Sequence, residues 1–145
     1  MSTANKLGRL GRREWTDLIA AQVALLRAQL QLRLQPVGSL VRREATEPLI
    51  QAGELERARA IALAVGRAAE HGVFRPRCLA RAIALRELLL KDGITGSTIK
   101  VGVRSDGGRF LAHAWVTWGE HVLGDDRWWI ARFTEVNDLR VLQDA

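Results

Sequence analysis

Arg75-Pro76-Arg77-Cys78-Leu79-Ala80-Arg81-Ala82-Ile83-Ala84-Leu85-Arg86-Glu87-Leu88-Leu89-Leu90 is the stretch that decides the fold, because it sets the chain's single cysteine directly before a periodic helix. Pro76 disfavours helical geometry at Arg75, so the helix is predicted to begin at about Arg77 or Cys78. Its apolar stripe comprises Leu79, Ile83 and residues 85, 88, 89 and 90. Gly93 is predicted to end the helix.

The position of Cys78 indicates a nucleophile. A thiol in the first turn of a helix lies at the positive end of the helix dipole, among unpaired backbone N–H groups, and both favour the thiolate. Arg75 and Arg77 add positive charge nearby. The alternative is a small buried apolar side chain, which is the ordinary role of a lone cysteine.

Composition indicates one globular domain. The chain has 145 residues, 48% of them apolar and 26% charged, which is enough for one real core and too short for two. A single cysteine excludes an internal disulfide and a multi-cysteine metal site, and it suits a reducing compartment. We therefore predict neither a metal nor a cofactor.

Targeting signals are weak. Arg12-Arg13 precedes an apolar stretch, but Glu14 and Asp17 interrupt it, and no stretch reaches the roughly 18 uninterrupted apolar residues of a membrane-spanning helix. The sequence predicts a cytoplasmic protein without a membrane span. The net charge of +6 comes mostly from arginine, which is typical either of an anionic partner or of solvated helix faces.

Two helices are predicted before the cysteine, after a flexible tail at residues 1–10. The first covers about residues 14–34, with large apolar residues at helical spacing: Trp15, Leu18, Ile19, Val23, Leu26, Leu30 and Leu34. We interpret this stripe as core packing; the alternative is an interaction surface. The second helix is expected from near Pro48 to about Glu70, ending at His71-Gly72.

After the cysteine helix the periodicity changes to that of strands. Residues 97–104, 109–118 and 121–124 are predicted strands, separated by turn signals at 105–108 and 119–120, and residues 130–133 are a further candidate strand. Helices followed by an antiparallel meander make an α+β domain. We expect residues 11–145 to form one domain, with a helical part at 11–72 and a catalytic core at 73–145.

His113 is the candidate base for Cys78. It shares one face of its strand with Leu111 and Trp115, and flanking alanines leave room for it to reach the start of a helix packed on that face. A nucleophilic thiol needs a base within hydrogen-bond reach and a third group that orients the imidazole. A mid-strand histidine can equally be a hydrogen-bonded core residue.

The third group is expected from Asp125 or Asp126 on the next strand. A two-residue turn at Gly119-Glu120 sets His113 opposite Asp126, whereas a three-residue loop from Trp118 sets it opposite Asp125. Hairpin geometry alone leaves the choice open.

Taken together, five segments resemble one family. They are residues 78–89, beginning Cys-Leu-Ala-Arg-Ala; Gly93-Ile94; Lys100-Val-Gly-Val-Arg104; Phe110-Leu-Ala-His-Ala-Trp-Val116; and Val122-Leu-Gly-Asp125. They are similar to the transglutaminase-like cysteine proteases of lasso-peptide biosynthesis, the B-type maturation proteins that remove the leader from a ribosomally made precursor. The resemblance spans Cys78 to Asp125, about a third of the chain, and it implies a papain-like core.

The resemblance implies roles and partners. By it Cys78 is the nucleophile, His113 the general base and acid, and Asp125 the orienting carboxylate, which in turn implies the odd-length hairpin loop. The chain resembles the stand-alone protease half of this family, which acts on a precursor peptide of leader plus core. The implied partners are a separate leader-recognition protein and an ATP-dependent lasso cyclase.

Two other functions fit parts of the sequence. A transglutaminase-like acyl transferase would use the same acyl-enzyme and pass the acyl group to an amine. A basic binding module is the alternative from another class, because four tryptophans lie near arginines in residues 104–132, and such interleaving can bind single-stranded nucleic acid or a partner. No recognised nucleic-acid motif is present, so we predict no nucleic-acid partner.

Overall fold

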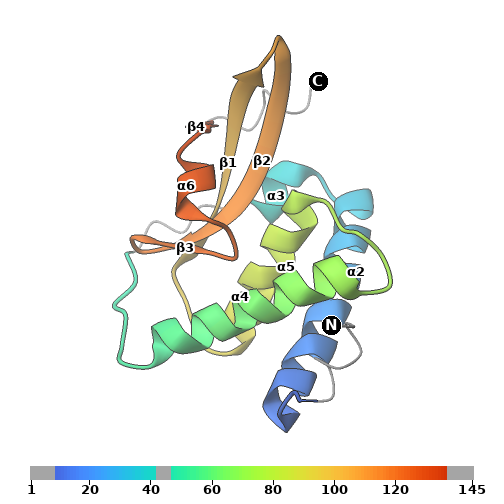
Figure 1. Ribbon diagram of the computed structural model, residues 1–145, viewed down its shortest axis with the longest axis vertical. Helices are drawn as coiled ribbons and strands as arrows, with labels where there is room; N and C mark the ends of the chain where they lie inside the picture. The colour runs from blue at the N-terminus through green and yellow to red at the C-terminus, as the bar shows by residue number, and fades with distance from the viewer. Residues whose placement is uncertain (1–8, 42–46, 137–145) are drawn as a thin grey trace.

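The long helices precede the strands along the chain, as predicted, whereas one short helix lies among the strands. The computed structural model describes residues 9–41 and 47–136 (Figure 1). Four helices come first: α2 (Arg12–Leu34), α3 (Val37–Leu40), α4 (Glu54–His71) and α5 (Cys78–Lys91). The rest of the described chain forms β1 (Ser97–Asp106), β2 (Arg109–Trp118), β3 (His121–Leu123), α6 (Arg127–Ile130) and β4 (Thr134–Glu135). The α+β class is confirmed.

The strands form one antiparallel sheet in the order β3-β2-β1-β4. Strands β1 and β2 pair over ten residues each, closed by Asp106 opposite Arg109 around Gly107-Gly108. Both loop glycines have positive φ, 57° and 83°, as a type I′ hairpin requires. The β1–β2 hairpin extends beyond the helical layer (Figure 1).

Helix α5 begins and ends where the sequence predicts. Its first residue is Cys78, after Arg77 in extended geometry. At its end Gly93, with φ 82°, donates to Leu90 O at 3.1 Å and Ile94 donates to Leu89 O at 2.9 Å, the hydrogen-bond pair of a Schellman motif. Both ends are therefore set by local sequence.

Helix α2 packs with the face opposite to the predicted one. Its buried residues are Ala21, Ala24, Leu25 and Ala28. The predicted stripe lies largely outside, with Ile19 62% exposed, Leu30 56% and Leu34 74%. Alanine lets α2 approach α4 and α5 closely, and because larger apolar residues occupy the other face too, spacing alone did not identify the inward side.

Two boundaries also differ from prediction. Helix α4 begins at Glu54 because Gly53 has φ 85°, a left-handed geometry that interrupts a helix, so the expected start near Pro48 is wrong. The strand expected at 130–133 is wrong as well: Asp126 caps helix α6 by accepting from Trp128 N at 2.9 Å. Residues 1–8 of the predicted tail, and those after 136, lie outside the described residues.

One apolar cluster joins the helices to the sheet. It includes residues of α2, α4, α5, β1, β2 and β3, and Trp118, 1% exposed, donates from its indole N–H to Thr95 O at 2.8 Å. Between the helices, partly buried Arg57 of α4 binds Asp17 of α2 at 2.6 Å and Asp92 after α5 at 3.0 Å. The Arg57 hydrogen bonds hold the pKa of Asp92 below its usual value.

Among the helices that the structure describes, none combines the length and the apolar character that a membrane span requires.

Candidate active site

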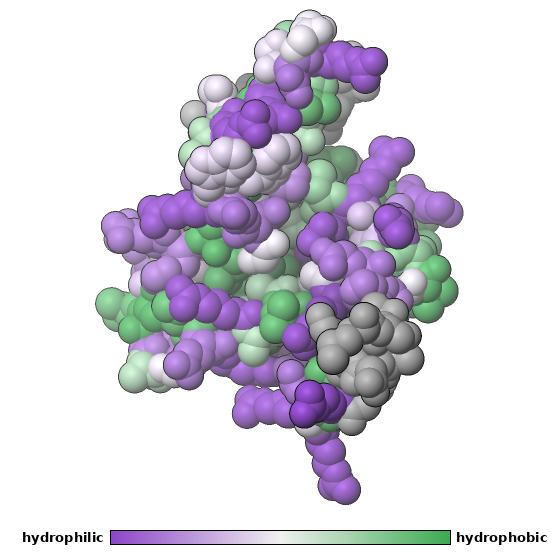
Figure 2. Space-filling view, viewed as in Figure 1, coloured by the Kyte–Doolittle hydropathy of each residue, from purple (hydrophilic) through white to green (hydrophobic). Residues whose placement is uncertain are grey.

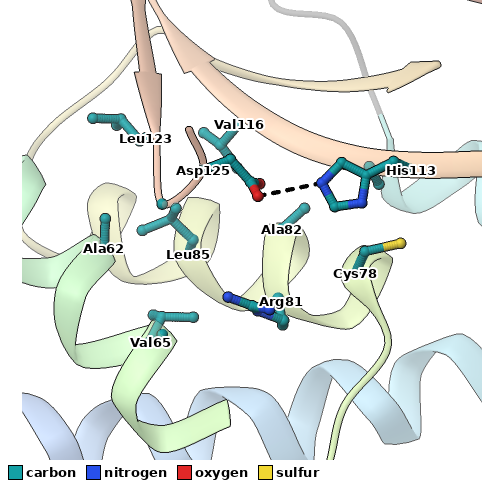
Figure 3. A pocket seen from close by; sticks show the side chains of 13 residues that line it. Ala62, Val65, Cys78, Arg81, Ala82, Leu85, His113, Val116, Leu123 and Asp125 are labelled. Carbon is teal, nitrogen blue, oxygen red and sulfur yellow. Dashed lines mark ion pairs between the residues drawn. The ribbon is translucent and has the colours of Figure 1, made fainter. Parts of the chain in front are cut away.

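A pocket opens where α4, α5, β2 and the loop after β3 meet. The three predicted site residues all line it, together with Arg81 and with apolar residues and glycines from both helices, the sheet and the loop. The lining residues are Ala62, Val65, Gly66, Cys78, Arg81, Ala82, Leu85, His113, Ala114, Val116, Leu123, Gly124 and Asp125 (Figure 3). Figure 2 shows apolar surface in a hollow between the projecting hairpin and α4, with hydrophilic side chains around it. The structure therefore brings Cys78, His113 and Asp125 together from distant parts of the sequence.

Cys78 occupies the first position of α5 and is partly exposed, with a free thiol. No described side chain caps this helix start, so the backbone N–H groups of its first turn are available to a ligand. Such groups can bind an anion that forms beside the sulfur.

His113 is held by aromatic rings on its face of β2. Its ring stacks on Trp115 with centroids 6.2 Å apart and tilts against Phe133 at 5.5 Å. Opposite His113 stands Gly102, where a Cβ would come within 2.8 Å of the Trp115 ring and 2.9 Å of Phe133 Cβ. Gly102 and Phe133 are therefore part of the site, and the sequence predicted a site role for neither. Gly102 stood within the Lys100–Arg104 segment of the family resemblance, and a glycine inside a strand was its one physical signal.

Helix α5 does not pack on the face that carries His113. The core-facing side of β2 carries Ala114, Val116 and Trp118, whereas His113 and Trp115 point to the opposite face. Residues of both faces nevertheless line the same pocket, so His113 meets Cys78 at the edge of the sheet. The expectation that the helix packs on the histidine face is wrong.

Asp125 is the carboxylate beside His113. Its Oδ1 lies 3.3 Å from His113 Nε2, an ion-pair distance, although the ring lacks the alignment of a hydrogen bond in the described structure (Figure 3). Burial raises the pKa of the Asp125 carboxyl above its usual value, and the electrostatic interactions with His113 and Arg81 offset this only in part. Asp126 faces elsewhere, as the α6 cap.

Asp125 reaches His113 by a different route from the one predicted. Trp118 pairs with His121, so the hairpin loop is the two residues Gly119-Glu120, and the odd-length loop implied by the resemblance is wrong. This register, if continued, would set His113 opposite Asp126. Pairing instead stops at Leu123, and Gly124, with φ 78°, turns the chain so that Asp125 reaches the histidine.

The thiol and the imidazole share the pocket without a hydrogen bond between them in the described residues. Because Nε2 faces Asp125, Nδ1 is the nitrogen left for the thiol and for a substrate. Catalytic hydrogen bonds are often long before a substrate binds, and they tighten in the complex. Within the described ranges no group of three or more His, Cys, Asp and Glu side chains is placed to hold a metal ion.

Several of the tryptophans and arginines on which the binding-module alternative rests are buried or contact one another within the fold. Trp115 and Trp118 are buried, and Arg104 lies 4.5 Å above the ring of Trp129. Arg132 packs 5.4 Å from Trp128 and 5.4 Å from Trp129. The Arg104 contact holds α6 against the hairpin, whereas the Arg132 contacts are local to α6 and the turn that follows it.

Comparison with known proteins agrees with this geometry. The family model described as transglutaminase-like superfamily matches residues 18–138. The chain belongs to the transglutaminase-like superfamily. No curated protein and no solved structure matches the chain. In this superfamily member the match includes the helical part from residue 18 onward, together with Cys78, His113 and Asp125.

Proposed function

We propose that this transglutaminase-like protein is a cysteine protease that removes the leader peptide from a lasso-peptide precursor. The observation that carries the proposal is that Cys78 at a helix start, His113 and Asp125 all line one pocket, with Asp125 beside His113. The likeness of residues 78–125 to the B-type maturation proteins supports the choice of substrate.

In the proposed mechanism the Cys78 sulfur forms a bond to the carbonyl carbon of the last leader residue, and the thiol proton passes to Nδ1 of His113. The backbone N–H of Cys78 stabilises the oxyanion. His113 then returns the proton to the nitrogen of the core peptide as the C–N bond breaks. Water hydrolyses the thioester with His113 as base, while Asp125 keeps the ring oriented through Nε2.

Two partners belong to the proposal. A separate recognition protein would hold the leader, and an ATP-dependent cyclase would use the amine that cleavage releases. The exposed apolar face of α2, formed by Trp15, Ile19, Val23, Leu26, Leu30 and Leu34, offers a surface for one of them.

The test is mass spectrometry of precursor peptides encoded by neighbouring genes, incubated with this protein and a separately expressed recognition domain. Cys78→Ala and His113→Ala should abolish cleavage at one bond, and Asp125→Asn should lower its rate by about 10²–10⁴-fold. Asp126→Asn is the matched control, because asparagine also caps helices and the rate should stay near wild type. Cleavage that survives Cys78→Ala would refute the thiol mechanism.

Acyl transfer is the second candidate, favoured by the superfamily itself, because an acyl-enzyme can react with an amine as well as with water. Adding a primary amine such as cadaverine to the same reaction separates the two. An amide product whose mass includes the amine, in place of the free leader acid, would identify a transferase.

A further inference from the structure

One edge of β2 is open beside the catalytic pocket. Strand β2 pairs with β1 along its whole length, but with β3 only over Val116–Trp118. From Arg109 to Trp115 its other edge has no strand next to it in the part of the chain that the structure describes. An open edge presents unpaired backbone donors and acceptors.

The hairpin turns determine which residues face this edge. In a two-residue turn the residue after the loop donates to the residue before it, so Arg109 N–H points to β1. Since the direction alternates along a strand, Phe110, Ala112 and Ala114 direct their N–H and C=O groups away from β1. The second turn agrees, because Trp118 directs its C=O to His121 of β3.

This edge runs from solvent into the pocket. Phe110 is 83% exposed and Ala112 is also exposed, whereas Ala114 is buried and lines the pocket. Ala112 directly precedes His113. A chain lying along the edge would therefore pass from the projecting hairpin to the groups that carry the chemistry.

The turn at Gly124 keeps the edge open. If β3 had continued in its register, Asp126 would stand opposite His113 and β3 would cover the backbone of Ala112 and Ala114. The chain instead turns at Gly124, with φ 78°, and sends only the Asp125 side chain to His113. The same turn supplies the carboxylate and leaves the neighbouring strand position vacant.

We propose that the edge of β2 from Phe110 to Ala114 binds the substrate peptide as an added β-strand, in line with β3, and so presents its scissile carbonyl to Cys78. The inference rests on the proposed protease function and adds the mode of substrate binding to it. Such strand addition draws its affinity from main-chain hydrogen bonds, and alternate side chains of the peptide contact the flanking surface. Exposed Phe110 and Leu111 supply apolar surface there.

Ala112→Pro tests the edge with little damage to the sheet. Proline removes only the N–H that points outward, and it is tolerated on an edge strand whose N–H faces solvent. Ala112→Val is the matched control, since it changes the side chain and keeps the donor. Circular dichroism and melting temperature check that both variants fold.

The readout is the rate at which Cys78 is modified, followed by mass spectrometry with two probes. One is iodoacetamide, which is too small to need the edge; the other is a pool of N-acetyl-tetrapeptidyl vinyl sulfones with randomised side chains. Ala112→Pro should slow the peptidyl probe about five- to tenfold, the effect of one lost hydrogen bond, and leave the iodoacetamide rate unchanged. Ala112→Val keeps the N–H donor and should slow the peptidyl probe less than Ala112→Pro does, and equal slowing in the two variants would overturn the proposal.

Backbone methylation of the probe keeps the test decisive if Ala112→Pro does not fold. Methylating each peptide nitrogen in turn should slow labelling of the wild-type protein about five- to tenfold at alternate positions only, because successive residues of a strand face opposite edges. Equal effects at all positions would overturn strand addition. A dimer in light scattering that Ala112→Pro dissociates, with an unchanged probe rate, would instead assign the edge to a second copy of the chain.

Failure of the proposed function gives a different pattern. If Cys78 were an ordinary thiol, iodoacetamide would modify it at the rate of an unfolded cysteine, and His113→Ala would not change that rate. The peptidyl probe would still label Cys78 slowly, and that slow rate would still show whether N-methylation acts at alternate positions only.

Discussion

At the scale of single residues, Gly102 places the aromatic rings that orient His113. A side chain there would meet the Trp115 ring at 2.8 Å and Phe133 Cβ at 2.9 Å, and neither a packed indole ring nor a backbone-attached carbon moves freely. We expect Gly102→Ala to lower the free energy of unfolding by about 1–3 kcal/mol and precursor cleavage at least tenfold. Urea unfolding and the cleavage assay measure the two effects.

Gly38→Ala is the control, because it is also a change from glycine to alanine but has nothing within 4 Å of the added carbon. It lies in α3, away from the pocket, and should leave both quantities near wild type or raise stability slightly. Equal loss of cleavage in both variants would contradict a positioning role for Gly102.

Asp125 is a residue whose presence costs stability. Burial raises the pKa of the Asp125 carboxyl, so the folded state favours the neutral acid. The stability that the neutral acid contributes is fully present below the usual pKa of 3.8, and it is lost as the pH rises through the higher pKa of the folded state. At neutral pH Asp125→Asn, which carries no charge, should therefore melt above wild type while losing activity. The advantage should shrink as the pH is lowered through the raised folded-state pKa toward the usual value of 3.8. A variant that melts lower than wild type at neutral pH would contradict this sign.

At the scale of elements, α2 offers two neighbouring leucines that test which face is buried. Leu25 is fully buried, whereas Leu26 is 49% exposed. Leu25→Ala should cost about 2–5 kcal/mol of unfolding free energy, and Leu26→Ala less than about 1 kcal/mol. Chemical denaturation of the two variants gives the comparison. Similar losses at both positions would mean that the outer face is also covered, as in a self-associated protein.

For helix α2 the sequence predicted the helix but not the face that it buries. Periodicity located the helix, but its two faces are both apolar, so the inward one depends on how closely alanines let α4 and α5 approach. The two main strands and the start of α5 were predictable because Gly107-Gly108 and Pro76 act on the local backbone. Helix α6 was missed because it has only four residues and depends on the Asp126 cap.

The pairing of His113 with Asp125 shows the same limit within the site. The residues themselves were identifiable from type and spacing, and the resemblance favoured the right carboxylate. The backbone path that brings Asp125 to His113 was not predictable. Hairpin register places only paired residues opposite one another, and Asp125 lies beyond Leu123, where pairing ends. Phe133, which packs on the His113 ring, follows a turn whose conformation no periodicity indicated.

At the scale of the whole molecule, the pocket lies between the two parts of the chain. Ala62, Val65 and Gly66 of α4 form one wall, and the strand residues and Asp125 form the other. A single apolar cluster runs through both parts, and Arg57 adds ion pairs between α4, α2 and the end of α5. The shape of the site should therefore depend on the helical part as strongly as on the sheet that carries His113.

This dependence predicts one cooperative unfolding transition for residues 11–145. Three probes report on different places. Far-ultraviolet circular dichroism follows mainly the helices, and alkylation of Cys78 follows the pocket. Tryptophan fluorescence, measured after Trp15 of α2 is replaced by Phe, follows mainly buried Trp115 and Trp118 of the sheet. Because the core is shared, the three urea transitions should have the same midpoint and slope. Loss of the helical signal at lower urea, with tryptophan fluorescence still native, would divide the chain into two units. If Cys78 also kept its native alkylation rate in that state, the α4 wall would be dispensable to the site.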